Sequence, residues 1–170
     1  LEIYSEEIPA KLQKNARDSL LKNFRDFFEK KNITFKKEFS YSTPNRLLIL
    51  FDGLNTEIQQ KEEEIRGPKI DAPEEALKGF LKSNNFSEKD MFKKEGEKGF
   101  FYYAKKPSKR IKVSELLSEN IPLILDKISW KKSMKWGEFE LYWARPIKSI
   151  LSIFNNKNLI FKYGHLESSN

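Results

Sequence analysis

Apolar side chains recur at spacings of three and four residues near the start of the chain. This apolar stripe consists of Leu12, Ala16, Leu20, Phe24, Phe27 and Phe28, and the opposite face is rich in lysine and arginine. Because one face of an α-helix repeats at this interval, the pattern predicts a long amphipathic helix that ends near Lys31. We expect Ser5 to cap this helix and Pro9 to help start it, since proline is tolerated in a first helical turn.

Two further stretches have helical spacing. Residues 73–82 predict a short helix with Ala76, Leu77 and Phe80 facing inward, followed by a polar stop at residues 83–85. Ser114 is expected to cap a third helix, whose apolar residues run as far as Ile128.

Short runs of alternating or continuous apolar residues predict strands between these helices. The runs cover residues 1–4, 34–41, 46–51, 57–65, 92–94, 100–105, 139–143, 147–154 and 159–163. Turn residues at 42–45 and glycines at 96 and 99 favour hairpins. We therefore expect an α+β (mixed α/β) fold with three main helices packed on short, largely antiparallel strands.

A length of 170 residues fits one domain and leaves room for two small subdomains with a boundary near residues 70–110. The first residue is Leu1 rather than Met, so we expect the chain to be part of a longer protein. No apolar run reaches the roughly 20 residues of a membrane helix, and no leader pattern is found at the start. The chain lacks cysteine, which excludes disulfides and thiolate chemistry and fits a reducing cytoplasm.

The chain is basic, with a net charge of +7 and an isoelectric point near 9.4. Such a surplus favours an anionic partner, with nucleic acid ahead of a membrane surface. However, lysine far outnumbers arginine and isoleucine far outnumbers valine, as A+T-rich coding would produce in any protein. The charge alone therefore leaves nucleic-acid binding and a solvated lysine surface as equal alternatives.

The inventory of reactive side chains is poor. The single histidine, His165, cannot build a metal cluster and is expected to have a local structural role. Glu6 and Glu7 precede the first helix, where carboxylates commonly complement its positive end rather than share a proton. No phosphate-binding glycine loop occurs. We expect neither a catalytic centre nor a metal site in this chain.

One segment combines tryptophans with basic residues. Lys131, Lys132, Lys135 and Arg145 are interleaved with Trp130, Trp136 and Trp143. Cations can bind phosphates, and aromatic rings can stack on unpaired bases, so the segment predicts nucleic-acid contacts with Trp136 as the stacking residue. The alternative is that the tryptophans are core anchors. Arg46, Arg66 and Lys69 lie in turn-rich segments and are further candidates for phosphate contacts.

Several short motifs appear in a characteristic order along the chain. They are Glu6-Glu-Ile-Pro-Ala10, Thr43-Pro-Asn-Arg-Leu47, Arg66-Gly-Pro-Lys69, Ala76 with Lys78-Gly-Phe80, Lys132-Ser-Met-Lys-Trp-Gly137, Arg145-Pro146 and Gly164-His165. With these motifs, the chain resembles the N-terminal part of the beta subunit of bacterial glycyl-tRNA synthetase, the heterotetrameric type. The resemblance covers essentially all of the chain.

The resemblance implies a division of labour between two kinds of subunit. In that family the alpha subunit holds the active site, which uses ATP, magnesium and glycine, and the beta subunit recognises tRNA. Two alpha and two beta chains assemble in the cytoplasm, without a membrane. This chain would then be a non-catalytic domain with no cofactor of its own, in contact with tRNA(Gly) or the alpha subunit.

Three hypotheses follow for the function. The first is an RNA-contacting and assembly domain of a tRNA ligase. Its candidate tRNA-binding residues are Lys131, Lys132, Lys135, Trp136, Arg145, Arg46, Arg66 and Lys69. The second is a protein–protein scaffold without RNA contact, packed through the tryptophans and the basic face of the first helix. The third, a free-standing enzyme, depends on His165 and the adjacent carboxylates alone.

Overall fold

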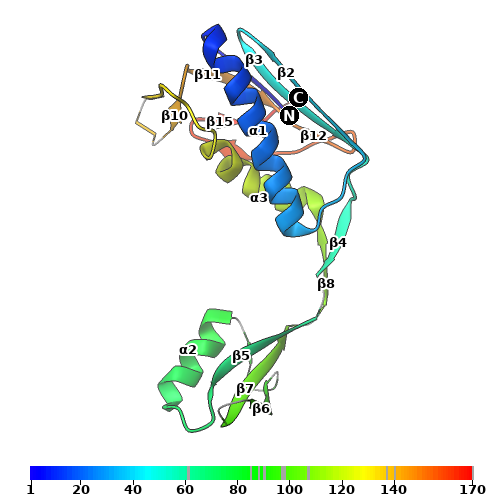
Figure 1. Cartoon of the computed structure of the whole chain (residues 1–170), viewed down its shortest axis with the longest axis vertical. Helices are drawn as coiled ribbons and strands as arrows, with labels where there is room; N and C mark the ends of the chain where they lie inside the picture. The colour runs from blue at the N-terminus through cyan, green and yellow to red at the C-terminus, as the bar shows by residue number, and fades with distance from the viewer. Residues whose placement is uncertain are drawn as a thin grey trace. The chain divides into compact units, whose positions relative to one another are not determined.

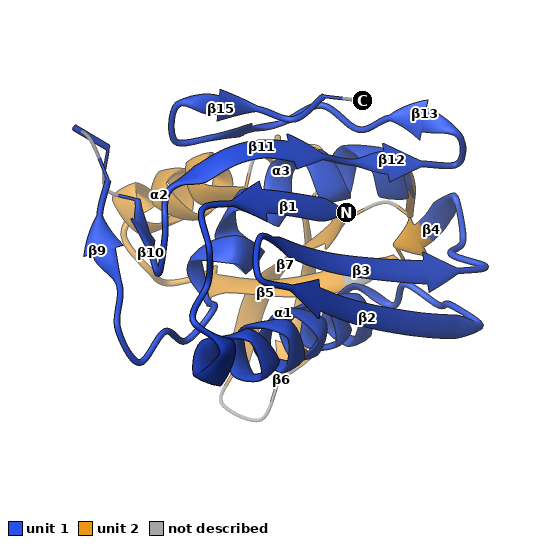
Figure 2. Cartoon of the chain, turned by 90° about the horizontal axis from the view of Figure 1, so that it is seen from above, with its two compact units in different colours: residues 1–58, 111–170 blue, residues 59–110 orange. Residues whose placement is uncertain are grey.

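The computed structural model describes residues 1–60, 62–84, 86–87, 89, 91–96, 99–106, 108–136, 138–139 and 141–169. The chain divides into two units, and Figure 2 distinguishes them by colour. Unit 1 comprises residues 1–58 and 111–170, and unit 2 comprises residues 59–110. Unit 2 is therefore an insertion in the sequence of unit 1. The boundary expected near residues 70–110, between two small subdomains of this chain, stays a prediction.

Helix α1 (Ala10–Lys31) follows the predicted apolar stripe and buries Ala16, Leu20, Phe24 and Phe28 (Figure 1). It ends where Asn32 adopts a left-handed backbone with φ of 55°, and the N–H of Ile33 donates to the carbonyl of Phe28. The predicted cap at Ser5 is wrong. Ser5 is fully buried in a strand, and Pro9 precedes the helix without a side-chain cap.

A four-stranded antiparallel sheet forms the other layer of unit 1. Its strands are β1 (Glu2–Ser5), β2 (Lys37–Thr43), β3 (Arg46–Asp52) and β11 (Ile147–Leu151), in the order β11-β1-β3-β2. Helix α1 packs against β2, β3 and helix α3 (Val113–Asp126). The predicted cap at Ser114 is also wrong, because α3 begins one residue earlier and Lys112 occupies the cap position without a side-chain hydrogen bond.

The core of unit 1 lies between these layers. Phe28 is its aromatic centre: its ring lies 4.8 Å from that of Phe51 and 5.8 Å from that of Phe24, both edge to face. Leu117, Ile121, Ile124 and Leu125 of α3 are buried in the same cluster. The helical stripes of α1 and α3 therefore face a single core, as amphipathic helices in a layered α+β domain do.

Three small hairpins complete unit 1. They are β9 (Met134–Lys135) with β10 (Tyr142–Trp143), β12 (Ile153–Phe154) with β13 (Lys157–Asn158), and β14 (Lys162–Tyr163) with β15 (Leu166–Glu167). The strand predicted at 147–154 is divided, because the N–H of Ser152 donates to Ser169 instead of continuing a ladder. The strands predicted at 139–143 and 159–163 are reduced to β10 and β14.

Unit 2 is a three-stranded antiparallel sheet with one helix. Strands β5 (Glu63–Lys69), β6 (Met91–Gly96) and β7 (Gly99–Lys106) are ordered β5-β7-β6, and helix α2 (Glu74–Asn84) packs on β5. Strand β4 (Glu57–Gln60) pairs with β8 (Lys109–Lys112), where the chain enters and leaves the unit.

Unit 2 confirms the hairpin predicted around residues 92–105 and corrects two other predictions. The run 57–65 belongs to two strands, because β4 and β5 pair with different partners. Ala76 of α2 is exposed rather than inward, whereas Leu77 and Phe80 are half-buried. The predicted α+β class, with three helices and short, largely antiparallel strands, is confirmed in the described part of the chain.

Candidate nucleic-acid interface

The segment that combines tryptophans with cations contains the β9–β10 hairpin of unit 1. Met134 pairs with Trp143, and Lys135 pairs with Tyr142. Strands this short are marginal by themselves. The hairpin gains two further bonds from Trp136: its backbone N–H donates to the carbonyl of Leu141 at 3.2 Å, and its indole Nε1–H donates to the carbonyl of Trp143 at 2.9 Å.

Of the three tryptophans, Trp143 is a core residue, and Trp130 and Trp136 are half-buried and pack against the core. Trp143 is fully buried, and its ring lies 4.9 Å from that of Trp130 and 6.3 Å from that of Tyr163. Neither indole N–H of Trp130 and Trp143 has a hydrogen-bond partner among the residues that the structure describes. Trp136 is half-buried at the edge of the same core. The tryptophans therefore anchor the hairpin, and base stacking by Trp136 stays a prediction.

The three lysines of this segment are exposed. Lys131 and Lys132 lie in the loop before β9, and Lys135 lies within β9. In the described part of the chain none of them forms an ion pair, whereas Lys148 pairs with Glu6 at 2.8 Å. An ammonium group without a carboxylate partner is free to bind an external anion. The tryptophans thus anchor a short hairpin that, with its preceding loop, presents three cations without an ion-pair partner among the described residues.

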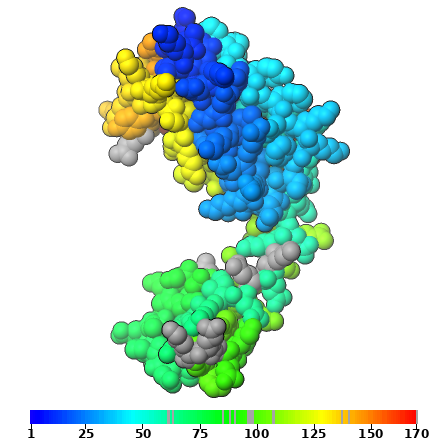
Figure 3. Space-filling view, viewed as in Figure 1, coloured from blue at the N-terminus to red at the C-terminus, as the bar shows by residue number. Residues whose placement is uncertain are grey.

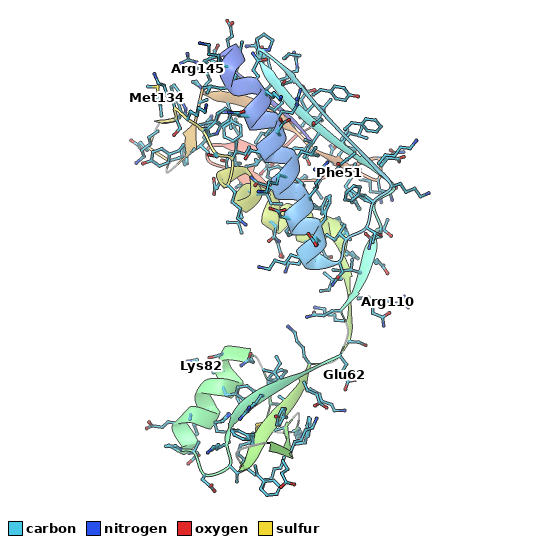
Figure 4. All side chains as sticks on the ribbon, viewed as in Figure 1. Phe51, Glu62, Lys82, Arg110, Met134 and Arg145 are labelled. Carbon is cyan, nitrogen blue, oxygen red and sulfur yellow. The ribbon has the colours of Figure 1, made fainter. Side chains whose placement is uncertain are left out.

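Arg145 lies near the start of α1. It is half-buried, and its Nε–H donates to the backbone carbonyl of Glu7 at 3.1 Å. In Figure 4, Arg145 and Met134 are labelled at the same end of unit 1. Figure 3 shows atoms of residues 125–150, in yellow and orange, beside the blue atoms of α1. Arg145 therefore extends the cationic surface toward the N-terminal helix.

The remaining candidate cations lie elsewhere. Arg46 of β3 forms an ion pair with Glu2 at 3.0 Å and covers the ring of Tyr4, with 4.7 Å between its Cζ and the ring centroid. Arg66 and Lys69 belong to β5 of unit 2 and lie over Phe101. Lys131, Lys132, Lys135 and Trp136 thus belong to the β9–β10 hairpin and its preceding loop and Arg145 follows β10, whereas Arg46 contacts β1 and Arg66 and Lys69 belong to unit 2.

His165 is exposed at the turn between β14 and β15, and its ring lies 5.8 Å from that of Phe139. Nearby, the hydroxyl of Tyr163 donates to Oδ1 of Asp126 at 2.9 Å. Burial and this hydrogen bond raise the pKa of Tyr163 above its ordinary value. The tyrosine is thus held in its protonated form, which suits a structural hydrogen bond rather than a proton-transfer group.

Neither a metal site nor a membrane-spanning helix is found among the described residues. No three histidine, aspartate or glutamate side chains are grouped so that they could hold a metal ion. No helix among the described elements has both the length and the apolar character needed to cross a membrane.

Sequence reasoning missed an apolar surface on the outer side of the unit 1 sheet. Phe39, Tyr41 and Leu50 are 41%, 56% and 48% exposed, and Phe39 pairs with Leu50 across β2 and β3. A cavity of about 640 Å³ borders this surface and is lined in part by Phe39, Leu50 and Phe51. The alternation at residues 34–41 was the available signal, because it placed Phe39 and Tyr41 on one side of a strand.

Comparisons with known proteins agree with the motifs. The family model of the glycyl-tRNA synthetase beta subunit matches residues 1–170. The glycine–tRNA ligase beta subunit of Rickettsia prowazekii is 40% identical over 170 residues, and that of Rickettsia felis is 39% identical. These alignments cover 100% of this chain and 25% and 26% of the two relatives, so the chain spans about a quarter of their length. The chain belongs to the glycyl-tRNA synthetase beta subunit family.

Proposed function

We propose that this chain is a non-catalytic part of a glycine–tRNA ligase beta subunit, which helps to bind tRNA(Gly) and to assemble the enzyme for ATP-dependent glycylation. The alpha subunit would use ATP, magnesium and glycine, in a cytoplasmic assembly of two alpha and two beta chains. The supporting observation is the set of exposed cations Lys131, Lys132 and Lys135, which form no ion pair with the described residues and lie on the tryptophan-anchored β9–β10 hairpin and the loop before it.

The proposed contacts are with phosphate groups. A lysine that neutralises a phosphate releases a condensed counterion, so binding weakens as salt rises, with a slope of roughly 0.7–0.9 per contact. Lys131, Lys132 and Lys135 form no ion pair with a carboxylate among the described residues, so phosphate binding does not first break an ion pair. Arg145, which follows β10, would add a guanidinium, and Trp136 follows Lys135 in the sequence and would stack on a base. Arg46, Arg66 and Lys69 are proposed as separate phosphate contacts.

The test uses the full-length beta subunit assembled with its alpha subunit. Lys131, Lys132 and Lys135 are changed together to Gln, and tRNA affinity is measured by filter binding at several salt concentrations. Three lost phosphate contacts should weaken binding and lower the salt slope by about 2–3. The matched control changes three exposed lysines of α1 to Gln, which removes the same amount of charge; they are Lys11, Lys14 and Lys22. Equal slopes in the two triple variants, or wild-type binding by the hairpin variant, would refute the assignment.

A protein–protein scaffold is the second candidate, and the apolar surface formed by Phe39, Tyr41 and Leu50 favours it. Exposed apolar patches of this kind commonly mark protein interaction sites. On this alternative the hairpin variant keeps wild-type tRNA affinity, because the chain contacts protein rather than RNA. Co-purification of the alpha subunit, measured on the same preparations, shows whether a variant that loses tRNA binding has lost its partner first.

A further inference from the structure

The sheet of unit 2 has two chemically different faces. Successive residues of a strand point to opposite sides, so the pairing register decides which side chains share a face. The registers of β5–β7 and β6–β7 bring one set together: Glu64, Arg66, Lys69, Phe92, Lys94, Phe101, Tyr103 and Lys105. A register shift between Arg66 and Lys69 keeps both cations on this side. We call this set the open face.

Helix α2 covers the opposite face. A Cβ added to Gly67 of β5 would lie 3.0 Å from Cε1 of Phe80 in α2, so the helix packs closely there. Ala104, three residues from Phe101 in β7 and therefore on the other side of the strand, is fully buried. Figure 1 shows α2 along one side of the β5–β7–β6 sheet. The open face has no such helix within the described part of unit 2.

The open face carries flat groups. The rings of Phe92 and Tyr103 are cross-strand neighbours, stacked with 6.0 Å between centroids and 28° between planes. The Cζ of Arg66 lies 3.7 Å from the centroid of Phe101. Phe101 is only 6% exposed while Arg66 is exposed, so the guanidinium covers the ring and faces solvent. Aromatic rings and guanidinium planes are the groups on which unpaired bases stack.

Cations surround these flat groups. The Nζ of Lys94 lies 5.5 Å from the centroid of Tyr103, and that of Lys69 lies 5.8 Å from the centroid of Phe101. Lys94 pairs with Glu64 at 2.7 Å, but this pair is exposed, and exposed pairs contribute little that phosphate binding would have to replace. Arg66 and Lys69 have no carboxylate partner in the described part of the chain. The face therefore combines flat groups with uncompensated positive charge.

We propose that the open face of unit 2 binds an unpaired segment of RNA. Bases stack on the Phe92–Tyr103 ring pair and on the guanidinium of Arg66, while Lys69 and Lys94 contact the backbone phosphates. Lysines by themselves would suit any acidic surface, but the ring pair between them suits a chain of flat bases. The identity of the RNA as tRNA rests on the proposed function, whereas the preference for unpaired nucleotides rests on this face alone.

The experiment uses the full-length beta subunit with its alpha subunit and an unstructured, fluorescein-labelled oligocytidylate of about 12 nucleotides, within the range of known single-strand site sizes. Phe92 and Tyr103 are both changed to Leu, which keeps apolar volume but removes the rings. The matched control is Tyr102→Leu, in the same strand but on the opposite face. Affinity is measured by fluorescence anisotropy at several salt concentrations.

The double variant should bind the oligonucleotide at least about tenfold more weakly, since one stacked base contributes a factor of this order. Its salt slope should not change, because no charge is removed. Tyr102→Leu should stay within about twofold of wild type, because Tyr102 lies on the face that α2 covers and not on the open face. Wild-type affinity in the double variant, or an equal loss in Tyr102→Leu, overturns the inference. Competition by oligoglutamate as strong as by oligocytidylate also overturns it.

A measurement on the wild-type assembly covers the case in which the double variant does not fold. Ultraviolet cross-linking to the oligocytidylate, mapped by mass spectrometry, should label Phe92 or Tyr103, and labels found only outside unit 2 overturn the inference. The two proposals fail separately. If the hairpin proposal is wrong, the hairpin variant keeps the wild-type salt slope for tRNA. If the open-face proposal is wrong, the Phe92 and Tyr103 double variant keeps wild-type affinity for the oligocytidylate.

Discussion

The indole N–H of Trp136 offers a sharp test of how the hairpin presents its lysines. Changing Trp136 to Phe keeps an aromatic ring but removes the donor that bonds to the carbonyl of Trp143 at 2.9 Å. The β9–β10 ladder contains only two residue pairs, so this side-chain bond is a large share of what holds the hairpin to the core. We expect the variant to be less stable and its lysine segment to be more mobile.

The magnitude follows from the environment of that bond. A typical hydrogen bond contributes about 0.5–1.5 kcal/mol, and a buried acceptor left without its donor adds to the loss. The accepting carbonyl belongs to Trp143, whose side chain is fully buried, so water cannot easily replace the indole. Together with the smaller ring, we expect a loss of about 1–2 kcal/mol, or about 2–8 °C in melting temperature for a chain of this size.

Urea denaturation of the 170-residue chain measures the loss, and a second variant separates the two roles of this residue. Trp136→Leu removes both the donor and the ring. If Trp136 stacks on a base, the Phe variant of the full enzyme should keep more tRNA affinity than the Leu variant, although both lose the hydrogen bond. A Phe variant as stable as wild type would refute the anchoring argument, and equal tRNA affinities in the two variants would refute stacking.

Two further predictions concern the core. Because the pKa of Tyr163 is raised in the folded chain, the tyrosine ionises first in the unfolded chain, so its contribution is complete below about pH 10 and lost above it. In urea denaturation, Tyr163→Phe should therefore cost about 1 kcal/mol at pH 8, and the sign of this difference should reverse within about one pH unit above 10, because ionisation of the unfolded chain changes it by about 1.4 kcal/mol per unit. A difference constant with pH would contradict the buried hydrogen bond. Phe28→Leu should cost about 1–3 kcal/mol, because it removes edge-to-face contacts with Phe51 and Phe24, whereas the half-buried neighbour Phe27 should tolerate the same change at under about 1 kcal/mol. Equal losses in denaturant at these adjacent positions would show that the ring geometry contributes little.

Local periodicity was enough to find the helices, and the ordered motifs carried the resemblance to the family. The stripe from Leu12 to Phe28 repeats at the helical interval, and four of its six positions are buried in α1. The hairpin around residues 92–105 was equally local, because its two strands are neighbours in the sequence. The ordered motifs identified the family without any knowledge of contacts, since they depend on residue identity and spacing alone.

Features that depend on distant residues could not be predicted in this way. Ser5 has the side chain of a helix cap, but β1 pairs on both sides with strands from other parts of the sequence, and this pairing buries Ser5 in the sheet. Residues 57–65 form one continuous polar and apolar run, yet β4 and β5 separate because their partners, β8 and β7, come much later in the chain. Pairing between strands that are far apart in the sequence produces no local pattern of apolar and polar residues from which it could be predicted.

The candidate sites show the same division. The sequence determined which residues can bind an anion or stack on a base, and it placed Lys131, Lys132 and Lys135 among tryptophans. Only the tertiary structure decided that Trp143 is buried while the lysines remain exposed and unpaired in the described residues. It also decided that Arg66 joins Phe92 and Tyr103 on one face of a sheet. The physical reason is that burial, charge pairing and strand register are set by neighbours in space, which residue spacing along the chain does not specify.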